Sequence, residues 1–315
     1  MARWGLLVAL IPLAVSTFWP SEDLKERIAQ TKKLYPAVVP KFETAGSTLD
    51  ELFEALPSHR ILGAAFARST NAHWMLALLS ALVFWEFILV IQPMGNSTSR
   101  QLWAVGIFTG TIGILLLMAI SYAGLVIPVI RYCFMAAFDE KSGFFASMVG
   151  FTISVGLLEE FCKALPLFWH FRRTATLDVR GAVVWGLATG IGFGVSEGIS
   201  YSDNFYNGVS TGEIYMVRFI SCVAIHAIWS ATAAILIWRR QEEIQAIEHP
   251  FQWLRPILMT VGISMVLHGF YDTCLKKHRD AAGLACALFS FALFFWLYDR
   301  ACREERRLRA SAATP

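Results

Sequence analysis

Charged residues are scarce in this sequence. They make up 16% of its 315 residues, whereas hydrophobic residues make up 56%. Soluble domains carry about 25% charged residues, so this composition indicates a polytopic membrane protein surrounded by the lipid bilayer. The net charge of +3 says little as a total, because in membrane proteins the distribution of charge between loops matters more. It gives no indication of a nucleic-acid partner, and we expect none.

Cysteine motifs are absent as well. The six cysteines lie in or beside apolar runs, and no two of them have the CxxC spacing of a zinc ribbon. We interpret them as small buried hydrophobic residues rather than as a disulfide framework. The sequence also shows no convincing internal repeat and no low-complexity segment.

Long apolar runs fill most of the chain, and about 20 residues of this kind span a bilayer as a helix. An N-terminal run, Trp4–Trp19, follows Arg3 and is shorter than that length. The seven later runs are Trp74–Ile91, Leu102–Ile127, Gly143–Trp169, Ala182–Tyr201, Ile214–Trp238, Pro256–Cys274 and Ala281–Tyr298. The predicted fold class is therefore all-α, a polytopic membrane helix bundle with seven core spans plus an N-terminal signal peptide or anchor.

The N-terminal run fits two interpretations. Ala14-Val15-Ser16 has the small residues of a signal-peptide cleavage site, whereas Phe18-Trp19-Pro20 is typical of an interfacial anchor. Both interpretations send the next segment out of the cytoplasm. We divide the chain into a signal peptide or signal anchor, an extracytoplasmic helical segment, a multi-span membrane domain and a basic cytoplasmic tail, which comprise residues 1–19, 20–73, 74–299 and 300–315.

Loop charges predict the orientation of the spans. The loop Ser202–Glu213 has no lysine or arginine. Arginines gather instead in two other loops and in the tail, at Arg172, Arg173, Arg180, Arg239, Arg240, Arg255, Arg300, Arg303, Arg306, Arg307 and Arg309. Because basic loops stay in the cytoplasm, we expect these segments inside and Ser202–Glu213 outside, with the protein in the plasma (inner) membrane. The turn with Lys276, Lys277 and Arg279 then lies outside and violates the rule.

Two carboxylates and a lysine interrupt the run Gly143–Trp169, at Glu159, Glu160 and Lys163. Each ionisable group near the bilayer centre costs about 2.5–3.5 kcal/mol on insertion scales, so these three must face protein or water rather than lipid. On a helix Lys163 is within reach of both glutamates, which point about 100° apart. We expect one glutamate to pair with the lysine and the other to face a cavity. The alternative is a buried ion pair that only fixes helix packing.

Further polar residues lie inside later runs at the i, i+4 spacing that aligns side chains on one helix face. They form the motifs Phe193-xxx-Glu197-xxx-Tyr201, His226-xxx-Ser230 and His268-xxx-Asp272. Together with Glu159-Glu160-xx-Lys163, and in this order, they resemble the PrsW family of intramembrane proteases and more distantly the CAAX prenyl-protein endopeptidases. The match runs from about Gly143 to Cys274. The resemblance implies an intramembrane endopeptidase whose substrate is a membrane-anchored protein, such as an anti-sigma factor.

We expect the polar groups to converge in one water-filled pocket between the midplane and the outer leaflet. The predicted catalytic residues are Glu159, Glu160, Glu197, His226 and His268, supported by Lys163, Tyr201 and Asp272. Lys163 is expected to compensate the charge of the glutamate pair.

Two chemistries fit this set. In one, Zn²⁺ is bound by His226, His268 and a carboxylate from Glu197 or Glu160, with Glu159 as general base and Asp272 orienting His268. In the other, which needs no metal, Glu159 and a neighbouring histidine activate water while His268 stabilises the oxyanion. The family resemblance favours a metalloprotease, but the sequence lacks a His-Glu-xx-His motif, and spacing alone leaves both schemes open.

Two other classes of protein carry intramembrane Glu, His and Asp residues. A proton- or ion-coupled transporter uses them as a proton relay, but it should also have paired, Gly/Pro-broken segments in related halves, which this sequence lacks. A non-catalytic membrane scaffold would retain the polar core for stability alone.

Overall fold

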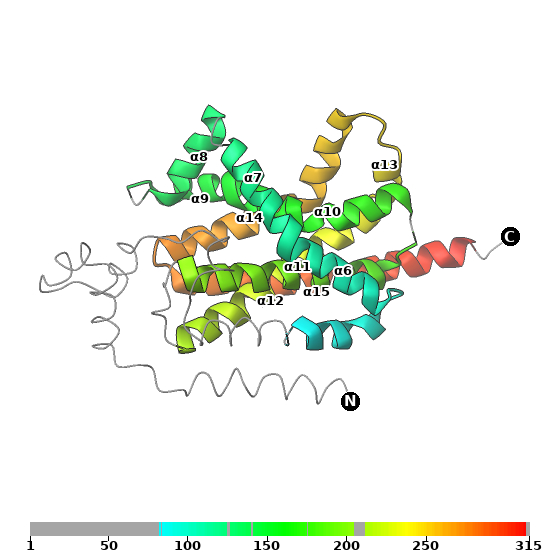
Figure 1. Cartoon of the computed structure of the whole chain (residues 1–315). Coiled ribbons are helices and arrows are strands. Elements are labelled where there is room, and N and C mark those ends of the chain that lie inside the picture. Colours follow the sequence, from blue (N-terminus) through cyan, green and yellow to red (C-terminus); the bar gives the residue numbers. More distant parts are fainter. Residues whose placement is uncertain are drawn as a thin grey trace, which may run out of the picture. The chain divides into compact units, whose positions relative to one another are not determined.

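The computed structural model describes residues 82, 84–124, 127–139, 141–174, 176–204 and 212–312 (Figure 1). Within these ranges it describes only the backbone of residues 118, 122, 198–204 and 212–221. The described residues form helices and no β-strand, which confirms the all-α fold class. The predicted signal peptide or anchor and the extracytoplasmic segment 20–73 lie outside the described residues.

Six helices among the described residues are long and apolar enough to cross a membrane. They are Ser99–Ser121, Phe144–Arg173, Val179–Glu197, Cys222–Arg239, Pro250–Lys276 and Asp280–Ala312. Each overlaps one of the predicted spans. Of the remaining predicted span, Trp74–Ile91, the structure describes the shorter apolar helix Phe84–Met94, so a seventh span stays a prediction.

The chain divides into two compact units. One consists of Met1–Val90 and Val195–Cys222, and the other, called here the main unit, of Ile91–Gly194 and Val223–Pro315. The elements of the main unit are η2 (Gln92–Met94), α6 (Ser99–Phe108), η3 (Thr109–Gly113), α7 (Ile114–Gly124), α8 (Pro128–Phe138), α9 (Phe144–Phe151), η4 (Thr152–Gly156), α10 (Leu157–Arg173), α13 (Gln241–Gln245), η5 (Pro250–Trp253), α14 (Leu254–Lys276) and α15 (Asp280–Ala312). Helices α11 (Val179–Asn204) and α12 (Gly212–Arg239) each contribute to both units.

The span that carries the glutamate pair is not a regular α-helix throughout. Helices α9 and α10 are joined without a break by η4, a single π-helical turn. Insertions of this kind are frequent at functional sites, and the extra residue in the turn changes the direction of the side chains that follow. Here the residues that follow are Leu157, Leu158, Glu159 and Glu160, at the start of α10.

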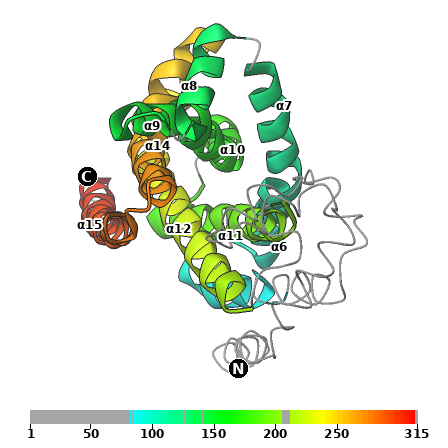
Figure 2. The same ribbon diagram turned by 90° about the vertical axis from the view of Figure 1, so that its left-hand side faces the viewer.

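Helix α14 is the packing centre of the main unit. It contacts α9, η4 and α10 as well as α15 (Figure 2). Its approach to η4 depends on glycine: a Cβ on Gly156 would lie 2.6 Å from the carbonyl oxygen of Met265, and a Cβ on Gly269 would collide with Thr152. Close backbone approach at small residues is the usual way in which membrane helices pack. The contact places His268, next to Gly269, opposite the first turn of α10.

Helices α11 and α12 also meet at glycine. A Cβ on Gly186 would lie 2.7 Å from the Cα of Ala231, and one on Gly190 would lie 2.6 Å from the Cα of Ala227. This second contact fixes the position of His226 along α12 relative to α11, because His226 directly precedes Ala227. The positions of His226 and His268 are therefore both set by close helix contacts at small residues.

Helix α15 extends beyond its predicted end. The sequence predicted a span that ends at Tyr298 and a separate basic tail, whereas α15 continues without a break to Ala312. The extension is stabilised by i, i+4 ion pairs between Arg303 and Asp299 and between Arg309 and Glu305. Ion pairs at this spacing stabilise a solvent-exposed helix, in which apolar packing contributes little.

A buried cluster of carboxylate, lysine and histidine side chains

Five of the predicted site residues meet in the main unit. Glu159, Glu160 and Lys163 come from α10, His226 from α12 and His268 from α14. All five are buried, with at most 7% of their surface exposed. Charged groups are almost never buried unless they are paired, so the contacts within this cluster must account for their presence.

Lys163 lies at the centre of the cluster. Its Nζ is 2.6 Å from Glu160 Oε1, 2.6 Å from His226 Nδ1 and 3.7 Å from Glu159 Oε2. The ammonium also lies 4.5 Å from the centroid of the Phe193 ring. Because an ammonium group can only donate, Nδ1 of His226 accepts from it, and Nε2 is the nitrogen that remains for another partner.

His268 is surrounded by carboxylates. Its Nδ1 is 3.0 Å from Glu160 Oε1, and its Nε2 is 3.4 Å from Asp272 Oδ2 and 3.7 Å from Glu159 Oε2. A carboxylate accepts, so the Nδ1–H of His268 donates to Glu160. Nε2 therefore points toward Glu159 and Asp272.

The two adjacent glutamates have different environments. Glu160 has no exposed side-chain surface, and its Oε1 is bound by both Lys163 and His268. The side chain of Glu159 is 10% exposed and stands 3.7 Å from the same two partners. The predicted pairing of one glutamate with the lysine is confirmed for Glu160, and Glu159 is the slightly more exposed of the two carboxylates.

Trp229 belongs to this cluster although the sequence gave no reason to select it. Its ring stacks on His268 with centroids 4.6 Å apart and an angle of 26° between the planes. Its indole Nε1–H donates to Ser290 Oγ at 3.1 Å, and its carbonyl accepts from Ser264 Oγ at 2.9 Å. Trp229 therefore holds the face of the His268 ring in a fixed plane. The only signal in the sequence is its position three residues after His226 on an apolar helix.

The cluster can hold a metal ion. Glu159, His226 and His268 each offer a ligand atom, and the three atoms lie within 4.8 Å of one another. Two imidazoles and one carboxylate are the donor set of many catalytic zinc sites. The carboxylate of this set is Glu159, whereas the sequence favoured Glu197 or Glu160.

The charge of the cluster also fits a divalent cation. With neutral imidazoles, the buried carboxylates of Glu159 and Glu160 and the ammonium of Lys163 leave a formal charge of −1 beside His268. Buried negative charge is costly. A bound cation would offset it, and the Nδ1–H of His268 already donates to Glu160, as the second nitrogen of a metal-binding histidine usually does.

Two predicted site residues lie outside the main unit. Glu197 belongs to the other compact unit, where its Oε2 accepts from Cys222 Sγ at 3.1 Å. The side chain of Tyr201 lies outside the described residues. Their participation in the site stays a prediction.

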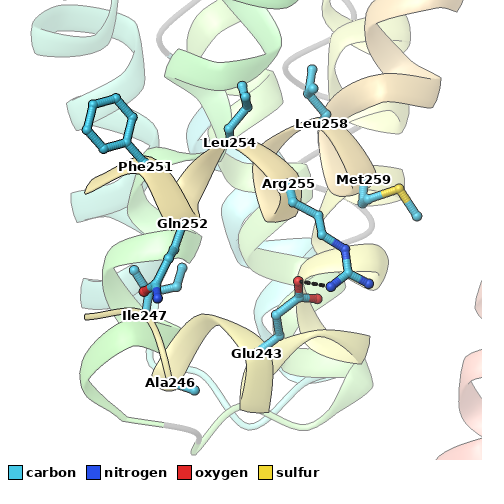
Figure 3. Close-up of a pocket in the computed structure, with 9 residues that line it drawn as sticks. All are labelled: Glu243, Ala246, Ile247, Phe251, Gln252, Leu254, Arg255, Leu258 and Met259. Atoms are coloured by element: carbon cyan, nitrogen blue, oxygen red, sulfur yellow. Dashed lines mark ion pairs between the residues drawn. The ribbon is translucent and has the colours of Figure 1, made fainter. Parts of the chain in front are cut away.

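The surface pocket drawn in Figure 3 is separate from the cluster. It lies between α13, η5 and the start of α14 and has a volume of about 640 Å³. An ion pair at 3.4 Å between Arg255 and Glu243 lies on its wall, and the rest of its lining is mainly apolar. No residue of the cluster lines it, so it is not the predicted catalytic pocket.

Comparison with known proteins found a family whose model covers all of these residues. The family model of the PrsW family intramembrane metalloproteases matches residues 100–298. That range is more than half of the chain and contains every member of the cluster. Searches of the curated proteins and of the solved structures found no match.

Proposed function

The chain belongs to the PrsW family of intramembrane metalloproteases, and from this premise we propose that the cluster on α10, α12 and α14 is its catalytic site. The observation that carries the proposal is the convergence of Glu159, His226 and His268 from three helices within 4.8 Å. Ionisable groups inside a membrane are costly, and where they persist they pair with one another or face water, usually at a functional site. Family membership favours the protease over the transporter that the sequence left open.

The metal that the family description implies would be held by these three residues, and we propose zinc. His226 would bind through Nε2, since its Nδ1 is 2.6 Å from the Lys163 ammonium. His268 would also bind through Nε2, since its Nδ1–H donates to Glu160. Bound there, zinc supplies Lewis-acid chemistry, polarising the scissile carbonyl and making the attacking water more acidic.

Asp272 is the proposed proton acceptor when Glu159 is a ligand. Its Oδ2 lies 3.4 Å from His268 Nε2, and its side chain is 23% exposed, more than any member of the buried cluster. A general base must stand within reach of the attacking water, and Asp272 Oδ2 is on the ligand side of the His268 ring. Without a metal, the same geometry gives the base role to Glu159.

Glu160, Lys163 and Trp229 are proposed as positioning residues. Glu160 and Trp229 fix the His268 ring by its edge and by its face. Lys163 holds Glu160 and His226 at 2.6 Å each and offsets one of the negative charges. Groups held this way lose no entropy during the reaction.

The proposed substrate is a membrane-anchored protein cut near the extracytoplasmic side of the plasma (inner) membrane, and a regulatory protein such as an anti-sigma factor fits this description. The position follows from the loop charges: the arginine-rich loop after α10 and the α15 extension mark the cytoplasmic side. His268 lies three residues past the midpoint of α14 on the way to the other side, about 4.5 Å at 1.5 Å per residue.

Metal content and cleavage, measured on the same sample, test the proposal. The full-length protein in lipid nanodiscs is given a single-span reporter that carries a fluorophore on each side of the bilayer. We expect about one zinc per chain, loss of cleavage on chelation and recovery when zinc is returned. Unchanged cleavage by a sample shown to be free of metal would refute the zinc site and leave the metal-free scheme with Glu159 as base.

A further inference from the structure

The α15 extension is held in place by its acidic residues. Glu304 Oε2 accepts from Arg239 Nε at the end of α12, at 2.9 Å. Glu305 Oε1 accepts from the backbone N–H of Val179 at the start of α11, at 3.3 Å, and from Arg309 at 3.1 Å. The basic segment is therefore a docked helix rather than a tail that reaches into solvent.

A basic pocket lies between this extension and the end of α12. Its volume is about 830 Å³. The residues that line it are Arg239, Trp296, Arg300, Arg303, Glu304, Arg307, Leu308 and Ser311. Four arginines against a single glutamate give the pocket a strong positive potential.

Two of the four arginines are not neutralised by a carboxylate. Arg239 pairs with Glu304, and Arg303 pairs with Asp299. Arg300 instead stacks over the Trp296 ring at 4.9 Å from its centroid. Among the residues that the structure describes, neither Arg300 nor Arg307 forms an ion pair. The pocket therefore presents two free guanidinium charges.

The pocket lies at the depth of the lipid headgroups. Helix α15 has 33 residues, about 50 Å at 1.5 Å per residue, and the hydrocarbon core is only about 30 Å thick. One face of the helix carries Phe289, Trp296, Arg300, Arg303 and Arg307, at spacings of three, four or seven residues. Phe289 and Trp296 are 57% and 51% exposed. Apolar, aromatic and basic side chains thus follow one another in the order of hydrocarbon, interface and headgroup.

We propose that this pocket binds the phosphate of an anionic phospholipid headgroup. Guanidinium groups bind phosphate oxygens through paired, charge-assisted hydrogen bonds, and clusters of basic residues next to a membrane helix attract anionic lipids. The lipid is favoured over a soluble phosphate because the apolar face at Phe289 and Trp296 continues from the pocket and accommodates acyl chains. The pocket of Figure 3 offers no such charge, since its Arg255 is paired with Glu243.

Two neighbouring arginines provide a matched test. Arg307 lines the pocket, whereas Arg306 is exposed on the same helix and does not. We compare Arg307→Gln with Arg306→Gln in full-length protein, titrating phosphatidylglycerol into phosphatidylcholine nanodiscs and following retained lipid by native mass spectrometry. Loss of a charge-assisted hydrogen bond to a phosphate oxygen is expected to weaken binding at least about tenfold. We expect this loss in Arg307→Gln, and in Arg306→Gln only the smaller loss, at most about fivefold, that comes from diffuse attraction to the surface.

Two outcomes would overturn the proposal. Equal losses in the two variants would mean diffuse attraction to a charged surface, without a pocket. Competition by inorganic phosphate at the lipid concentrations used would make a soluble phosphate the ligand. Arg307→Lys keeps the charge but not the planar fork, so intermediate binding is expected if the pocket recognises phosphate geometry. Monodispersity and reporter cleavage are measured in each variant. Both are expected to match the wild type because Arg306 and Arg307 are far from the cluster in sequence and form no ion pair with any described residue.

Discussion

Replacing Glu159 by glutamine separates the catalytic interpretation of the cluster from the structural one. Glutamine has nearly the shape of glutamate but binds zinc poorly and accepts no proton. The adjacent change, Glu160→Gln, is the matched control, since it alters the same chemical group one residue away. The structure predicts opposite results for the two.

The expected cost in stability follows from the contacts. Glu159 stands 3.7 Å from both Lys163 Nζ and His268 Nε2, beyond hydrogen-bonding distance. Its attraction to the lysine is offset by repulsion from Glu160 and Asp272, so Glu159→Gln should change the free energy of unfolding by less than about 1 kcal/mol. Glu160→Gln loses its charge in contacts with Lys163 at 2.6 Å and His268 at 3.0 Å, and hydrogen bonds of charged groups contribute about 1.5–3 kcal/mol each.

The expected loss of rate is large for Glu159→Gln. Removing a metal ligand forfeits several kcal/mol of transition-state stabilisation, which is at least about 10²-fold in rate. We therefore expect normal abundance and thermal stability, bound zinc reduced, and reporter cleavage lowered by 10²-fold or more. Glu160→Gln should instead lower stability first and lose cleavage together with folded protein.

The assay is metal content, melting temperature and cleavage on the same nanodisc preparation of each variant. If Glu159→Gln loses cleavage but keeps its zinc, Glu159 is the proton acceptor and not a ligand. If it keeps both zinc and cleavage at normal abundance, the assignment of the cluster as catalytic is wrong, and the glutamate pair returns to a structural role.

Three further predictions follow from individual contacts. Lys163→Met should destabilise the protein by about 3–5 kcal/mol, because it leaves buried carboxylates without their cation; a variant that melts with the wild type would contradict this. Trp229→Phe should cost about 1 kcal/mol through the lost hydrogen bond to Ser290 and should lower kcat with little change in KM; an unchanged kcat would mean that the stacked ring does not position His268. Cysteines placed at Ser210 and Ser311 report topology. A membrane-impermeant thiol reagent added to intact cells should label the cysteine at 210. Labelling at 311 alone would show that the predicted orientation is wrong.

The sequence predicted the spans well because each depends on local composition. Six of the seven predicted core spans overlap helices of membrane length. The continuation of α15 past the predicted span has a physical reason: beyond Tyr298 the helix is no longer stabilised by apolar packing but by pairs such as Arg309 with Glu305 and by the contact of Glu304 with Arg239. Composition marks those residues as polar without indicating whether they continue the helix.

The sequence predicted which residues form the cluster, but it did not predict which of them contact one another. Lys163 is within i, i+3 and i, i+4 reach of both glutamates, so spacing does not decide which one it binds. The choice depends on the rotation of α10 relative to α14, and that rotation follows the π-helical turn η4 and the close contact of Gly156 with Met265. Trp229 was missed for a similar reason, since its stacking on His268 joins two helices far apart in the sequence.

The same contacts explain why the cluster tolerates so much buried charge. Each member is held by a helix whose position is already fixed by glycine contacts, so that no member can turn toward lipid without separating two helices. A structural ion pair would need only Lys163 and Glu160, whose Nζ and Oε1 lie 2.6 Å apart. Glu159, Asp272 and the Nε2 atom of His268 add carboxylate charge and a ring nitrogen that this pair does not require. Because a second buried carboxylate lowers stability unless a ligand or a reaction uses it, Glu159 is the strongest reason to regard the cluster as a functional site.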